Sequence, residues 1–520
     1  MLLYAVVVTV FVVMAIRLAS QNNWPGQPDS MTSQQIARSI VNGEGMLSRN
    51  VCQHVVPVDL PHVPIHRKPA FVLLVAGLFS LFGVNLAVPV VFNALTILAI
   101  SFVIFRVVRL IGSRTPAYGL AALYLISGHY ELLSLSNNNL LTLLTCLLLW
   151  IGCACILKRL RLRSFFMLAL LVASCGVMAK PTFILSAAAA SFFVFLVVEP
   201  TCSWRSVLRA GVSAGLLCLA TLAVLTPMWL PNVVAHGSPF HSVQPALRLS
   251  ERYACLPHGT FETVRYNQPV TYGDVIGHLG VSGLVKAEVG IWIHSLKSAV
   301  LQNPLLYLIA ILGGVLSIRR KVFRIYGLVL GAACESFLVP TLLWAPEDRY
   351  YWPLFACVVI VAGFIVVDLR SILAQQFSAE NRRRFAIAVV FLFVIVGAGA
   401  ARYGVQVWSR SFSLAHTETP AWVAAAEHIP EDAIVLTNNP FAVSYWTNRK
   451  TVIIPRGSAD DLSAVLERYR PSYYLDTSGT AGTYAFRVTR DLVTVASSAI
   501  GEDRWTLFEI RHPEPLSTTF

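Results

Sequence analysis

The sequence predicts an all-α polytopic membrane bundle followed by a small C-terminal α/β soluble domain, and three observations lead to this fold class. Of the 520 residues, 56% are hydrophobic and only 13% are charged, which is more apolar surface than a soluble protein of this length can bury. The apolar runs are continuous, whereas the strands of a membrane barrel would alternate, so the runs are helices. After Arg402 the composition becomes that of an ordinary soluble protein.

Basic residues exceed acidic ones, giving a formal net charge of +13. A charge of this size is also found in nucleic-acid-binding proteins, but here the basic residues form short clusters between apolar runs. Such clusters are typical of the flanks that hold a membrane orientation. We therefore exclude nucleic acid as a partner.

Apolar segments of near-spanning length predict about eleven transmembrane helices. They lie at 2–18, 86–105, 117–133, 140–157, 165–179, 182–198, 210–230, 302–318, 325–344, 352–369 and 385–401. Basic clusters follow every second segment, at 106–114, 158–163, 205–209, 319–324 and 370–384. By the positive-inside rule the N-terminus lies inside and the C-terminus outside.

The remaining apolar stretch, residues 69–83, is too short to span, and making it span would place a basic cluster outside. We expect it to be a re-entrant or interfacial helix. Two long outer loops, 19–68 and 231–301, are then the places where function is expected, because long loops on one face usually carry it. The predicted domains are a transmembrane domain, 1–401, and an extracytoplasmic domain, 402–520.

The C-terminal domain contains the segments DAIVLTN, KTVIIP and PSYYLDT, which predict strands, and SADDLSAVLERYR, which predicts a helix between two of them. It has no Gly-rich phosphate loop and no nucleophile motif, so a folding or docking role is expected. No CxxC metal pattern is present, and we expect neither a metal nor a cofactor. Cys52 and Cys255 fall in the outer loops, where either a disulfide or two free thiols fits the sequence.

Two carboxylates of the first outer loop are candidates for acid–base chemistry. Asp29 precedes a short amphipathic helix expected to lie at the membrane surface, where it is either the helix N-cap or a general base that deprotonates an acceptor. Asp59, in PVDLPHVP, is either a second carboxylate of the site or a solvated loop residue.

Cations from distant segments converge on the predicted outer face. Arg349 and Tyr350, in the polar island APEDRYYWP, belong either to an interfacial belt or to a phosphate site, since guanidinium binds phosphate bidentately. Lys180, in MAKPT, is either a snorkelling helix-end lysine or a second phosphate ligand. His66 and Lys68 precede the re-entrant helix at the same depth.

Acidic residues within the apolar segments are few, chiefly Glu335, which is expected to be paired or to face a channel. An ion pathway would place more ionisable groups in mid-helix. The grouped outer cations therefore favour a lipid-phosphate pocket.

These motifs, in this order, resemble the GT-C superfamily of membrane glycosyltransferases, in particular its protein O-mannosyltransferase and aminoarabinose transferase branch. The likeness rests on Asp29 followed by IARSIVNGEG, on KPAFVLLVAGLFSLFG, AKPTFIL and DRYYWPLFACVVIVAG, and on the soluble tail. The resemblance implies a polyprenyl-phosphate-linked sugar as donor and a metal-independent inverting transfer to a lipid, polysaccharide or protein acceptor. It also implies Asp29 as the base, with Arg349 and Tyr350 facing the carrier phosphate. Since this branch is found widely in bacteria, the expected location is a bacterial plasma (inner) membrane.

The chain departs from that family at Ser33, where relatives often carry a tyrosine, and at SNNN 136–139, where many carry an acid. The alternative function is a transporter or flippase of lipid-linked saccharides, which would require inverted repeats that this sequence does not show. Two further alternatives are an O-antigen ligase or polymerase, which is not expected to end in a soluble domain, and a non-enzymatic scaffold.

Overall fold

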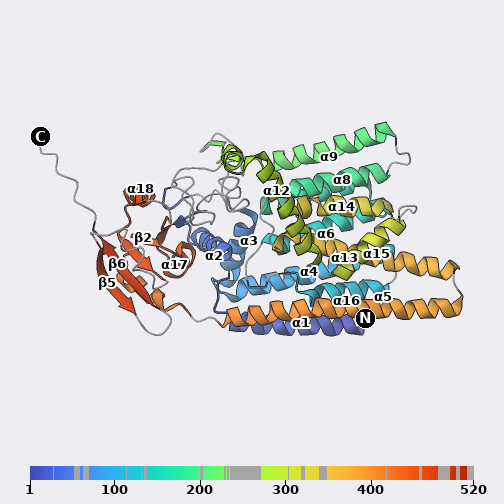
Figure 1. Ribbon diagram of the computed structural model, residues 1–520, viewed down its shortest axis with the longest axis horizontal. Helices are drawn as coiled ribbons and strands as arrows, with labels where there is room; N and C mark the ends of the chain where they lie inside the picture. The colour runs from blue at the N-terminus through green and yellow to red at the C-terminus, as the bar shows by residue number, and fades with distance from the viewer. Residues whose placement is uncertain are drawn as a thin grey trace, which may run out of the picture.

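The computed structural model describes residues 1–511, apart from residues 27, 52–58, 63–68, 113, 131, 134–136, 199–202, 228, 229, 231, 232, 235–270, 302, 303, 318–322, 339–347, 377, 417, 418, 456–458, 478–491 and 499–503. Within this part the chain forms a long helical bundle with a small sheet at one end, which we call the sheet end (Figure 1). The prediction of a helical membrane bundle with a small C-terminal α/β domain is confirmed.

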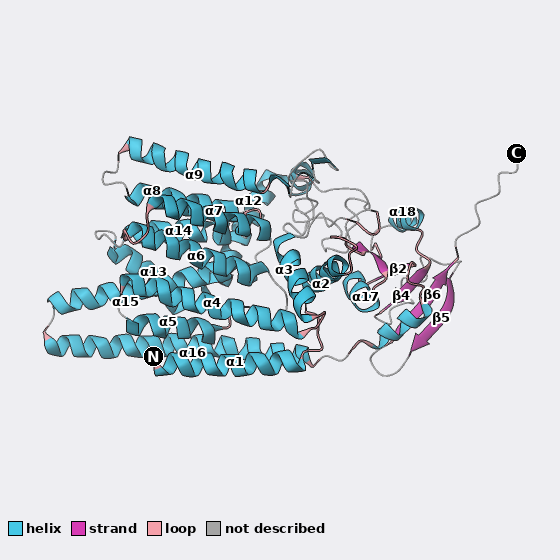
Figure 2. Cartoon of the chain, turned by 180° about the vertical axis from the view of Figure 1, so that it is seen from behind, coloured by secondary structure: helices cyan, strands magenta, loops and turns pink. Residues whose placement is uncertain are grey.

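Helices of the described chain overlap all eleven predicted apolar segments. They are α1 (Leu2–Gln21), α4 (Ala87–Ile111), α5 (Arg114–Ser127), α6 (Asn137–Ile156), α7 (Leu162–Ala179), α8 (Phe183–Val198), α9 (Trp204–Val224), α13 (Pro304–Ser317), α14 (Phe323–Leu338), α15 (Trp352–Gln376) and α16 (Ala379–Ala415). Six helices of the described chain are long and apolar enough to cross a membrane. The protein is therefore an integral membrane protein. Helices α9 and α16 both begin at the end remote from the sheet (Figures 1 and 2). Their first two turns carry the basic residues Arg205, Arg209 and Arg382 to Arg384.

Small residues bring two helices of the bundle into close contact. A Cβ atom added at Gly331 of α14 would lie 2.8 Å from the backbone carbonyl carbon of Ala189 in α8. Helices in a membrane approach this closely only where small residues face each other. The contact brings α14 against α8, one helical turn before Glu335.

Three segments differ from the sequence prediction. Residues Tyr272–Leu301, expected in an outer loop, form the helix α12, which bends at Gly280, where φ is +66°. Its stretch Gly273–His294 is one of the six span-length helices. The mean hydropathy of this stretch, 1.2, is lower than that of the other five, which explains why the sequence indicated a loop. Apolar residues such as Val285 and Ile293 are nevertheless exposed on α12.

The last membrane helix also runs further than predicted. α16 continues from the predicted end at residue 401 to Ala415, and the backbone N–H of Asn23 donates to the carbonyl of Ala415 over 2.9 Å. The predicted end was placed where the apolar run stops, before polar residues such as Arg402 and Arg410. These residues are compatible with helical backbone, and the helix continues through them. The C-terminal domain therefore begins after α16, with the 3-10 helix η3 (Ala421–His428).

The stretch expected to be re-entrant is α3 (Pro69–Phe82), which lies with α2 (Pro28–Val41) between the bundle and the sheet (Figures 1 and 2). Phe71, Val75 and Phe79 of α3 are buried together with Ala37 of α2. Helix α2 is enclosed by α3 on one side and by the C-terminal domain on the other. Its place at the membrane surface stays a prediction.

The C-terminal domain is a six-stranded sheet of order β1-β3-β2-β4-β6-β5. Its elements are β2 (Ile434–Thr437), α17 (Pro440–Thr447), β3 (Lys450–Ile453), α18 (Ala459–Tyr469), β4 (Tyr473–Asp476), β5 (Leu492–Ser498) and β6 (Trp505–Ile510). Strands β1 to β4 pair in parallel, and Val435 and Leu436 of β2 are both fully buried, because α17 covers one face and α18 the other. The three predicted strands and the predicted helix are confirmed.

One strand of this sheet comes from the other end of the chain. β1 (Asn50–Val51) lies in the loop after α1 and pairs in parallel with Thr451 and Val452 of β3. The first long loop is thus built into the C-terminal domain, a connection that the sequence did not predict.

Candidate active site

Lys180 occupies the break between α7 and α8. Helix α7 ends at Ala179 because Pro181 disfavours helical backbone at the preceding residue, and Lys180 is extended, with φ −157° and ψ 114°. The side chain is only 6% exposed. A lysine that snorkels would hold its ammonium in water, so that interpretation of Lys180 is wrong.

Glu335 of α14 forms an ion pair with Lys180. Its Oε1 atom lies 2.6 Å from Lys180 Nζ and accepts a hydrogen bond from Thr182 Oγ1 over 2.9 Å. The carboxylate side chain is 3% exposed. Of the two alternatives for Glu335, pairing is therefore what the structure shows. A buried charge is tolerated when it is paired and hydrogen-bonded, as here.

The 3-10 helix η2 (Asp348–Tyr351) brings Tyr350 to the same place. Lys180 Nζ lies 4.8 Å from the centre of the Tyr350 ring, within the range of a cation–π interaction. Two residues predicted from separate motifs, Lys180 and Tyr350, are thus in contact. Arg349 is the neighbour of Tyr350 in η2, and its side chain lies outside the described part of the structure. His66 and Lys68 also lie outside the described residues, as do Cys52 and Cys255.

Asp29 is the second residue of α2, after Pro28, and not the residue before the helix. Proline is favoured in the first turn, which explains why the helix starts earlier than the apolar pattern indicated. Helix α3 packs against both α2 and α7. The helix that carries Asp29 and the helix that ends beside Lys180 are therefore separated by a single element at the sheet end.

Asp59 lies elsewhere. Its carboxylate is 88% exposed, and Oδ1 is 2.5 Å from Arg468 Nη2 of α18. The contact joins the first loop to the soluble domain, on the side of the sheet that α18 covers. The structure therefore does not bring Asp59 to Lys180, and its predicted role as a second carboxylate is not supported by its position.

The asparagines at 137–139, which replace the acid of many relatives, are part of the helix packing. Asn139 Nδ2 donates to Asn93 Oδ1 over 3.2 Å, and Asn93 Nδ2 donates to the carbonyl of Leu132 over 3.0 Å. The first of these buried bonds ties α6 to α4, and the second ties α4 to the connection between α5 and α6. Thr182 is a site residue that sequence reasoning missed, and its place two residues after Lys180 was the available signal.

Comparisons with known proteins identify a matching family model and similar folds. Residues 63–230, which include Lys180, match the family model described as dolichyl-phosphate-mannose-protein mannosyltransferase. No curated protein matches the sequence significantly.

Solved structures match over nearly the whole chain. ArnT from Cupriavidus metallidurans bound to undecaprenyl phosphate is 13% identical, with 97% of each chain covered and a TM-score of 0.55. The archaeal oligosaccharyltransferase AglB from Archaeoglobus fulgidus, in complex with an inhibitory peptide and a dolichol-phosphate, is 12% identical over 93% of this chain and 70% of that one, with a TM-score of 0.56. The predicted resemblance to the GT-C superfamily is thus confirmed by the family model and by the fold.

Proposed function

We propose that this protein is a membrane glycosyltransferase that moves a sugar from a polyprenyl-phosphate-linked donor to an acceptor on the extracytoplasmic side. The observation that carries the proposal is the buried lysine–glutamate pair beside Tyr350 at the sheet end. Lys180 is there a fixed cation, next to the helix that bears Arg349 and one element away from the helix that bears Asp29. The structures of ArnT with undecaprenyl phosphate and of AglB with a dolichol-phosphate support a donor of this kind.

In this proposal the donor phosphate lies against Lys180 and Arg349, with Tyr350 at its edge and Lys68 and His66 nearby. Glu335 and Thr182 hold the Lys180 ammonium in one place, so no reorganisation is needed when charge develops on the phosphate. The isoprenoid tail lies along the lipid-facing helices. The phosphate oxygen is the leaving group.

Asp29 acts as the general base. Its carboxylate takes the proton of the acceptor hydroxyl or amine, whose lone pair attacks the anomeric carbon of the sugar from the face opposite the phosphate. The bond from that carbon to the phosphate oxygen breaks, and polyprenyl phosphate leaves with both electrons. The configuration inverts, and the positive charge required comes from side chains without a metal.

The membrane orientation follows from the basic connections. Positively charged connections remain in the cytoplasm, so the end remote from the sheet is cytoplasmic and the sheet end is extracytoplasmic. In a bacterial plasma membrane, this arrangement places the site where polyprenyl-linked sugars of the cell envelope are used.

The test is turnover by the full-length protein in lipid nanodiscs with a panel of polyprenyl-phosphate sugars, measured as release of polyprenyl phosphate. Asp29→Asn should lose roughly 10²- to 10⁴-fold in rate, because removing a general base costs about that much. The matched control is Asp59→Asn, which removes the other carboxylate of the same loop and should keep full activity. Undiminished release by Asp29→Asn would end the proposal, and no release with any donor would favour the transport alternative.

A further inference from the structure

Helix α2 is held by the C-terminal domain through Arg38. The Arg38 guanidinium carbon lies 4.0 Å from the centre of the Tyr445 ring in α17, and Nη1 donates to the Tyr445 carbonyl over 3.1 Å. Burial raises the pKa of Tyr445, so the phenol is neutral, and its hydroxyl donates to Gln34 Oε1 over 3.4 Å. Tyr445 is 3% exposed. One buried tyrosine thus engages two residues of α2 that lie one turn apart.

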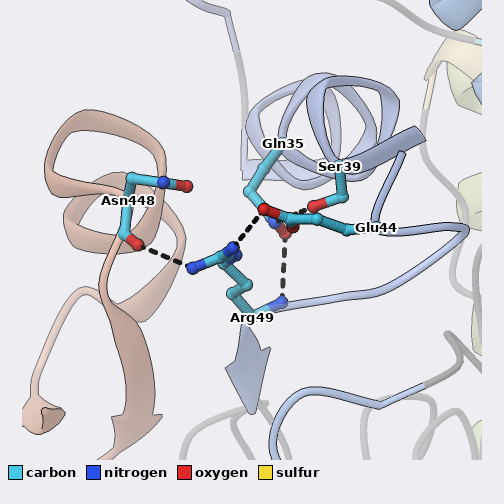
Figure 3. A network of polar contacts seen from close by, with 5 residues as sticks. All are labelled: Gln35, Ser39, Glu44, Arg49 and Asn448. Carbon is cyan, nitrogen blue, oxygen red and sulfur yellow. Dashed lines mark hydrogen bonds and ion pairs between the residues drawn. The ribbon is translucent and has the colours of Figure 1, made fainter. Parts of the chain in front are cut away.

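Arg49 forms a second link between the same two helices (Figure 3). Its Nη1 donates to the carbonyl of Asn448, the residue that caps α17, over 3.3 Å. Its Nη2 is 2.7 Å from Glu44, and its backbone N–H donates to Gln35 Oε1 over 3.1 Å. The last turn of α17 is therefore joined to α2 and to the residues that follow it.

These contacts lie on the side of α2 away from position 29. Nine residues separate Asp29 from Arg38, which is two and a half turns at about 3.6 residues per turn, so the two positions lie on opposite sides of the helix. Ile40 lies about three turns from position 29, on the same side, and it packs with the α3 cluster of Phe71 and Val75. The side of α2 that bears position 29 is therefore turned toward α3.

We propose that the C-terminal domain positions α2, and that Arg38 is a positioning residue for the reaction of Asp29. The inference rests on the proposed function, since it takes Asp29 as the base. Because α17 contacts α2 on the side opposite position 29, it fixes the helix without approaching that position. A displacement of about 1 Å at a reacting group lowers a rate roughly 100-fold, so a contact remote from the chemistry can control kcat.

The experiment compares Arg38→Gln, Arg38→Lys and Arg468→Gln in the full-length protein in nanodiscs. Arg468→Gln is the matched control, because Arg468 also joins the first loop to the domain but contacts Asp59 and not α2. Two quantities are measured, hydrogen exchange of the α2 amides and the steady-state kinetics with the polyprenyl-phosphate sugar that the wild type uses.

Arg38→Gln should speed exchange in α2 and lower kcat roughly ten- to a hundredfold, with the KM for the donor nearly unchanged. Arg38→Lys keeps a cation over the Tyr445 ring and should recover part of the loss. Arg468→Gln should match the wild type in both measurements.

If Arg38→Gln had the α2 exchange rates and the kcat of the wild type, the positioning role would be overturned. If Asp29→Asn were at the same time inactive, the proposed function would still stand. Full activity of Asp29→Asn would instead overturn the proposed function and the positioning role with it.

Discussion

Two ion pairs of the protein have nearly the same length but different surroundings. Lys180 Nζ lies 2.6 Å from Glu335 Oε1, and Arg468 Nη2 lies 2.5 Å from Asp59 Oδ1. The side chains of the first pair are 6% and 3% exposed, and those of the second are 44% and 88% exposed. In water the attraction is screened and both side chains lose conformational freedom, so an exposed pair contributes little. Inside the bundle each charge depends on the other, because neither can be solvated.

The comparison teaches that distance alone does not identify a functional ion pair. The buried pair also contacts Thr182 and lies beside Tyr350, so it joins three segments: the connection between α7 and α8, helix α14 and η2. The exposed pair joins two. A cation that is held in place among apolar helices is suited to a lipid phosphate, whereas an exposed arginine is already surrounded by water.

The largest effect is expected when one partner of the buried pair is removed. Lys180→Met leaves Glu335 buried without its cation, which should destabilise the fold by roughly 3–5 kcal/mol. The measurement is the apparent Tm of the detergent-solubilised protein. The double variant Lys180→Gln/Glu335→Gln removes both charges, and it should recover most of that loss. A single variant as stable as the wild type would show that the pair is not buried in the membrane.

A smaller effect is expected at His62, a half-buried residue of the first loop whose backbone pairs with Ser48. Burial lowers the pKa of His62 to about 4, below its ordinary value of 6.5, so the folded loop favours the neutral imidazole. This contribution to stability is present above pH 6.5 and is lost as the pH falls toward 4.

The apparent Tm of the wild type should therefore fall more steeply between pH 7 and pH 5 than that of His62→Gln, which has no titrating group at this position. Parallel curves for the two proteins would contradict the burial of the imidazole.

The smallest effect is expected at the exposed pair. Arg468→Gln should change the free energy of unfolding by about 0–1 kcal/mol, and added salt should reduce even that difference. The same thermal measurement, at low and at high ionic strength, checks it. A loss as large as that of Lys180→Met would mean that exposure does not separate the two pairs.

The helices could be predicted from the sequence because a bilayer allows only a few solutions for an apolar run. The same rule failed at α12 and at the end of α16. The α12 segment has a lower mean hydropathy than the other spans, so it was predicted to be a loop. In α16 polar residues ended the apolar run while the helix continued to Ala415. The strands and helix of the C-terminal domain followed from their alternation and helical spacing.

The contacts between distant segments could not be predicted in this way. β1 has two residues, too few to show a period, and its partner Thr451 lies about 400 positions later. Arg38 and Tyr445 are similarly far apart, and neither belongs to a motif. Lys180 and Tyr350 were chosen for the chemistry of their side chains. That they are in contact, with Glu335 as the third member, is known only from the packing of α7, α8 and α14.

The central claim is that the cation at Lys180 binds a lipid phosphate, and binding of undecaprenyl phosphate in nanodiscs tests it most directly. Lys180→Gln/Glu335→Gln is the variant to use, because it keeps the fold while removing the cation. It should bind at least about tenfold more weakly than the wild type, a difference of roughly 1.4 kcal/mol. Asp29→Asn should bind as the wild type does. Equal affinity of the wild type and the double variant would contradict the account.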